Sequence, residues 1–148
     1  MIAGLFKSAA GPRYDPRDIC AGAPMMKSTL LILTLMADDG TRITMSSYDT
    51  PEACEGAREV VTQVLADAGQ EMLLAMCGET DLRVTPYVHG APRRAEVNRF
   101  RVELPANGGF TVTPLTDEPC EDAQGADPVV YCTLSAQRVI AANQVQTR

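Results

Sequence analysis

The residues best suited to chemistry in this chain are its five cysteines, Cys20, Cys54, Cys77, Cys120 and Cys132. Their spacing contains no Cys-x-x-Cys pair of the kind that zinc and redox motifs use. The single histidine, His89, cannot complete a typical zinc-binding set. The chemistry that this pattern predicts is therefore disulfide formation.

Cys54 and Cys77 are predicted to pair because a helix and a strand of similar length separate them. The helix from Cys54 to Ala68 would span about 21 Å at ~1.5 Å per residue. The strand from Gln70 to Cys77 would span about 23 Å at ~3.3 Å per residue. Because the helix and the returning strand have nearly equal lengths, the end of the strand comes back to the start of the helix, which brings Cys54 and Cys77 together.

Cys120 and Cys132 form the second predicted pair, across a loop rich in proline, glycine and acidic residues. Closing a loop of roughly a dozen residues contributes ~3 kcal/mol in the chain-entropy description of disulfides. Cys20 is then left free or paired with another chain. The alternative is that all five are buried thiols in a reducing compartment, because cysteine also serves as a small core residue.

No other group of residues predicts catalysis, a metal site or a cofactor. His89 lies in an apparent loop, between Val88 and Gly90, and we expect it to be a surface residue. A cluster of acids could in principle bind calcium, but its spacing does not match an EF-hand, and we expect a solvated loop. Its members are Asp117, Glu118, Glu121, Asp122 and Asp127. The sequence therefore predicts a protein that is not an enzyme.

Four arginines, Arg93, Arg94, Arg99 and Arg101, form the basic concentration of an otherwise acidic chain. Arg99 and Arg101 alternate along a predicted strand and so share one face. Two interpretations stay open: a solvated strand face, or a contact surface for an acidic protein neighbour.

Composition sets the outer limits on function. A chain of 148 residues with 45% apolar and 22% charged residues is typical of one globular domain. The net charge of −6 argues against direct binding of nucleic acid. The longest apolar run, Thr29 to Ala37, is too short to span a membrane. It could instead be the core of a signal peptide that starts at Met26, but Leu35 suits a cleavage site poorly, and we expect a strand.

Apolar periodicity and turn residues predict one helix and several strands. Thr50 can cap the helix, Pro51 suits its first position and Gly69 ends it. Cys54, Ala57, Val61, Val64, Leu65 and Ala68 are expected on its buried face. The helix is predicted at 51–68 and strands at 28–36, 42–48, 72–77, 82–88, 99–104, 110–115 and 129–134.

These elements predict an α+β fold with a small antiparallel or mixed β-sheet and the helix at about 51–68 packed on it. Residues 26–135 would form the single domain, with a strand-turn-strand-helix-strand unit at 26–90 and a C-terminal β-hairpin extension at 96–135. Residues 1–25 contain several glycines and prolines and are expected to be an extended N-terminal arm. Residues 136–148 are expected to be a polar tail.

The function expected from these features is that of a non-enzymatic structural or accessory subunit of a large multiprotein assembly. Its partners would be other protein subunits, contacted through Leu5 and Phe6 of the arm and through the four arginines. A virion component, such as a capsid-decorating or head–tail protein, is the favoured version, and an accessory subunit of a membrane-bound complex is another. The alternative is a small secreted or periplasmic binding protein stapled by disulfides. Paired cysteines would favour a virion, periplasmic or extracellular location.

Overall fold

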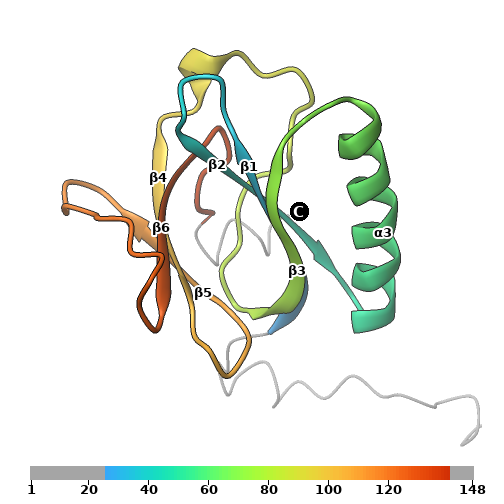
Figure 1. The fold of residues 1–148 in the computed structure, drawn as a ribbon. Helices are drawn as coiled ribbons and strands as arrows, with labels where there is room; N and C mark the ends of the chain where they lie inside the picture. The colour runs from blue at the N-terminus through green and yellow to red at the C-terminus, as the bar shows by residue number, and fades with distance from the viewer. Residues whose placement is uncertain (1–25, 141–148) are drawn as a thin grey trace, which may run out of the picture.

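The computed structural model describes residues 26–140. Within this range one α-helix packs on a six-stranded mixed sheet, which confirms the predicted α+β class (Figure 1). The elements, in chain order, are β1 (Lys27–Leu35), β2 (Thr41–Tyr48), α3 (Pro51–Asp67), β3 (Met72–Thr80), the short 3-10 helix η1 (Arg93–Ala95), β4 (Asn98–Leu104), β5 (Thr111–Leu115) and β6 (Val129–Ser135).

The strand order across the sheet is β3-β1-β2-β6-β4-β5. All neighbouring strands are antiparallel except β2 and β6, which run parallel and pair at only two positions, Thr41 with Thr133 and Arg42 with Leu134. The last strand thus inserts between β2 and β4. The β4–β5 hairpin, predicted from the sequence as an extension of the domain, is joined through β6 to the same sheet.

Helix α3 begins where its capping residues predict. The backbone N–H of Ala53 donates to the Thr50 hydroxyl at 3.1 Å, and Pro51 occupies the first turn. The buried face carries Cys54, Ala57, Val61 and Leu65, which pack against Leu30 and Ile32 of β1. Val64 and Ala68, which the periodicity placed on this face, are exposed instead. The helix therefore keeps two valines, Val60 and Val64, outside the core.

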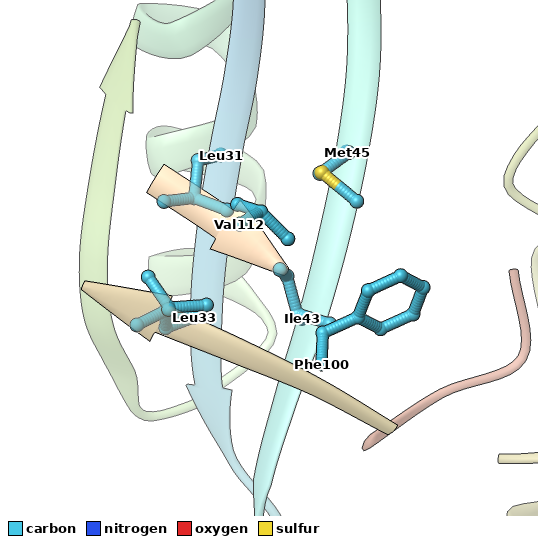
Figure 2. Packing of buried hydrophobic residues seen from close by; sticks show 7 residues of the cluster. Leu31, Leu33, Ile43, Met45, Phe100 and Val112 are labelled. Carbon is cyan, nitrogen blue, oxygen red and sulfur yellow. The ribbon is translucent and has the colours of Figure 1, made fainter. Parts of the chain in front are cut away.

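A second hydrophobic cluster fills the opposite, concave face of the curled sheet. Figure 2 shows side chains of this cluster converging from β1, β2, β4 and β5. Its buried members are Leu31, Leu33, Ile43, Met45, Phe100, Val102 and Val112. Phe110 closes this cluster by lying against Gly78 of β3, where an added Cβ would come within 2.6 Å of the Phe110 ring. Any larger residue at position 78 would therefore force the Phe110 ring to move.

Residues 138–140, which the sequence placed in a polar tail, pack against the segment 83–85. Val84 and Val139 form an isolated antiparallel bridge. The Thr85 N–H donates to the Arg138 carbonyl at 2.9 Å, and the Ile140 N–H donates to the Arg83 carbonyl at 2.9 Å. The predicted strand at 82–88 is thus reduced to this short pairing, since Pro86 has no N–H to extend it. The folded body reaches Ile140.

Candidate functional site

Both predicted cysteine pairs are disulfide-bonded in the structure. The Cα atoms lie 6.2 Å apart in Cys54–Cys77 and 5.9 Å apart in Cys120–Cys132. Cys54 lies fully buried on the inner face of α3, so the first bond fastens the helix to β3. The second closes the loop that precedes β6. Cys20 lies outside the described residues.

Two of the arginines predicted to contact a partner, Arg99 and Arg101, bind groups of their own chain. The Arg99 guanidinium donates to the carbonyl oxygens of Thr116 and Glu118 at 2.9 and 2.8 Å. Arg101 forms an ion pair with Glu103 at 3.3 Å on the same strand. Arg99 therefore holds the segment that comes after β5 through neutral carbonyl groups, whereas Arg101 is paired with a carboxylate.

The other two arginines lie in η1. Arg93 forms an ion pair with Asp38 at 3.0 Å and donates to the Glu96 carbonyl at 3.3 Å. The Gly40 N–H and the Arg93 guanidinium lower the pKa of the Asp38 carboxyl. Arg94 has no side-chain partner among residues 26–140 and is the arginine of this group most available for intermolecular contact. The predicted partner residues Leu5 and Phe6 lie outside the described range.

The acidic loop uses its carboxylates to hold backbone. Asp122 accepts from the Cys132 N–H at 2.7 Å, and Asp127 accepts from the Ala106 N–H at 2.9 Å. Backbone N–H groups, its own among them, lower the pKa of Glu118. In the described part of the chain no three His, Cys, Asp or Glu side chains are grouped so that they could hold a metal ion. His89 is exposed, with its ring centroid 6.4 Å from that of Tyr87.

A cavity of about 500 Å³ lies where β2 and β6 separate after their two paired positions. Four segments far apart in the sequence build it: the middle of β2, the loop 85–91, Glu96, and residues 135–138. Its lining residues are Arg42, Ile43, Thr44, Thr85, Pro86, Tyr87, Val88, Gly90, Ala91, Glu96, Ser135, Ala136, Gln137 and Arg138.

Gln137 keeps the two strands apart at the cavity. Its side chain, only 3% exposed, accepts from the Met45 N–H at 2.9 Å and donates to the Met45 carbonyl at 2.9 Å. It also donates to the Thr85 carbonyl at 2.8 Å. The Gln137 amide thus pairs with the Met45 N–H and C=O groups of β2 in place of a neighbouring strand. Such a substitute is needed because buried backbone N–H and C=O groups must be paired.

An ion pair between Arg42 and Glu96 forms one wall of the cavity. Glu96 is only 5% exposed, and both its oxygens accept from Arg42, from Nε and, at 3.1 Å, from Nη2. The hydrogen bond to Glu96 raises the pKa of Arg42. Removing Arg42 would leave the buried Glu96 carboxylate without a counter-charge, so the pair ties the end of η1 to β2.

The outer face of α3 is the second candidate surface. Val60 and Val64 are 63% and 58% exposed and stand one helical turn apart, in line with Ala53 and Gly56. Figure 1 shows α3 at one side of the molecule, with the sheet on one side of the helix only. Acidic residues flank the apolar line: Glu52, Glu55, Glu59 and Asp67. We call these eight residues the outer helix surface.

Sequence reasoning missed both places. The cavity depends on Glu96 and Gln137, which carry no local signal because their partners lie 54 and 92 residues away. The outer helix surface could have been found from the spacing of Val60 and Val64, had Val64 not been assigned to the buried side.

Comparison of the chain with models of protein families, with curated proteins and with solved structures gave no match. Within residues 26–140, α3 is not long and apolar enough to cross a membrane.

Proposed function

We propose that the protein is a non-enzymatic accessory subunit that binds another protein of an assembly through the outer helix surface. The observation that carries the proposal is the pair of exposed valines, Val60 and Val64, on a helix whose opposite face is already packed and disulfide-bonded. Fully burying a valine contributes about 1.5 to 3 kcal/mol. A partner that covered both would therefore gain a substantial apolar contact.

Gly56 gives independent support. Glycine inside a helix costs about 1 kcal/mol relative to alanine. A Cβ added at Gly56 would meet nothing within 4 Å, so packing inside this chain gives no reason for glycine there. A partner that packs closely against the helix would give one.

The flanking charges indicate the chemistry of that partner. Glu52, Glu59 and Asp67 have no arginine or lysine partner among the described residues, whereas Glu55 pairs with Arg58 at 2.7 Å. The matching surface would be apolar at its centre with lysine or arginine at its rim. Arg94 and the arm residues Leu5 and Phe6 would extend the contact to further subunits. A virion shell is one setting for such a protein.

The two disulfides favour a second candidate, a small secreted or periplasmic binding protein that acts alone. Disulfides persist in oxidising compartments and are rare in the cytosol. This candidate uses the same outer helix surface but predicts a free monomer between binding events.

The test is sedimentation of the untagged protein from its native source, followed by mass spectrometry of its companions. We expect migration with a complex far heavier than 15.9 kDa. Val60→Gln with Val64→Gln should release the protein from that complex, since glutamine keeps helix propensity but removes the apolar contact.

Val97→Gln is the matched control, because Val97 is 67% exposed but lies away from α3. This variant should stay in the complex. Migration of the wild-type protein as a free monomer would remove the subunit proposal and leave the second candidate. Retention of the double variant would show that the outer helix surface is not the contact.

A further inference from the structure

The cavity between β2 and β6 is preformed. Its width is set by Gln137, which holds Met45 and Thr85 by three hydrogen bonds, and by the Arg42–Glu96 pair. These contacts are internal to the chain, so the cavity does not depend on a ligand to stay open. A volume of about 500 Å³ is in the range that suits small molecules.

The charges in its lining do not balance. Two arginines and one glutamate contribute side chains, so one positive charge is left over. Glu96 occupies Nε and Nη2 of Arg42, and among residues 26–140 Nη1 has no hydrogen-bond partner. The Arg138 guanidinium likewise makes no hydrogen bond within the described range.

Arg138 is nevertheless held in place. Its backbone N–H donates to the Thr85 hydroxyl at 3.1 Å, and its carbonyl accepts from the Thr85 N–H at 2.9 Å. An arginine with a fixed backbone and a guanidinium that has no partner among residues 26–140 is suited, at a cavity, to bind a planar anion with two parallel hydrogen bonds.

We propose that this cavity binds a monocarboxylate that carries an apolar body. Arg138 would hold the carboxylate, with Nη1 of Arg42 and the Tyr87 hydroxyl as further donors on the same lining. Pro86, Val88 and Ala136 supply an apolar wall for the rest of the ligand. A dianion such as phosphate suits the site less well, because Glu96 is buried beside Arg42 and only one positive charge is left over.

Such a carboxylate has two sources: a free small acid, or the C-terminal carboxylate of a peptide. Both offer the same group to Arg138, and they differ in the length of the chain attached to it. A peptide would place the residues before its C-terminal one outside the cavity, whereas a free small acid would not reach beyond it.

The experiment is a titration of the full-length protein by two-dimensional NMR with two matched pairs of probes. The first pair is N-acetyl-leucine and N-acetyl-leucinamide, and the second is a leucine-ended tetrapeptide with a free or an amidated C-terminus. We expect saturable shifts of the backbone amides of Thr44, Thr85 and Val88 with a free carboxylate, and none with the amides. Tighter binding of the acid or of the peptide then identifies the source.

Arg138→Gln should weaken binding by about tenfold or more, since it removes a charge-assisted pair of hydrogen bonds. Arg94→Gln is the control, because Arg94 is another exposed arginine without a partner in the described range but does not line the cavity. The proposal is overturned by equal binding of the amides, by unchanged affinity in Arg138→Gln, or by the absence of saturable shifts with both carboxylates.

Discussion

The Cys54–Cys77 bond should contribute more to stability than the Cys120–Cys132 bond. The perturbation is replacement of each pair by alanine, in a background where Cys20 is serine so that no free thiol can exchange. The sequence separation is 23 residues in the first pair and 12 in the second. Loop entropy alone then predicts losses of about 3.4 and about 2.8 kcal/mol in the free energy of unfolding.

The deeper burial of the Cys54–Cys77 bond makes the expected difference in stability loss between the two pairs larger. The Cys54 side chain is fully buried between α3 and the sheet, whereas Cys120 and Cys132 are only partly buried. Removing the buried sulfur leaves a small cavity, which costs about 1 kcal/mol more. The loss should therefore be about 4 to 5 kcal/mol for Cys54→Ala with Cys77→Ala, and about 3 kcal/mol for the other pair.

Urea denaturation without reductant, followed by circular dichroism, measures both losses as changes in the free energy of unfolding. Because domains of this size are stable by only about 5 to 15 kcal/mol, the loss in the first variant should be a large fraction of the total. An equal or larger loss for the second pair would refute the reasoning from loop length and burial.

Three further substitutions test the packing described above. Gly56→Ala should raise the free energy of unfolding of the free protein, measured in urea, by about 0.5 to 1 kcal/mol. The same change should weaken co-sedimentation of the protein with the assembly. A loss of stability would mean that the fold of the chain itself needs this glycine. Gln137→Leu should cost about 2 to 4 kcal/mol because it leaves the Met45 N–H and C=O unpaired, and a change below 1 kcal/mol would contradict that role. Gly78→Ala should cost about 1 to 3 kcal/mol through its collision with the Phe110 ring. Adding Phe110→Leu should recover part of that loss, and strict additivity of the two changes would exclude the steric explanation.

The features predicted correctly from the sequence are those that depend on short stretches of chain. The start of α3 is encoded by Thr50 and Pro51, and the turn between β4 and β5 by its glycines, both of which adopt positive φ. The Cys54–Cys77 bond could be predicted from lengths alone, because one helix and one strand connect its ends. Each of these predictions needed only local geometry.

The features that the sequence did not reveal depend on contacts between distant segments. No local signal places β6 between β2 and β4, since the partner of Thr41 is Thr133. The arginines illustrate the same limit: alternation placed Arg99 on a strand face, but its carbonyl partners lie 17 and 19 residues along the chain. The cavity could not be predicted because its walls come from four such segments.

The position of β6 also determines the order in which the parts of the sheet can fold while the chain is being synthesised. β1, β2, α3 and β3 are consecutive and pair with one another, so this module can assemble as soon as residues 27–80 have been synthesised. The far side of β2 must wait until Thr133 and Gln137 have been made. During that interval β2 is a temporary sheet edge, the kind of surface that recruits strands from other chains. We therefore expect the nascent chain, rather than the finished protein, to be the form that most needs a chaperone.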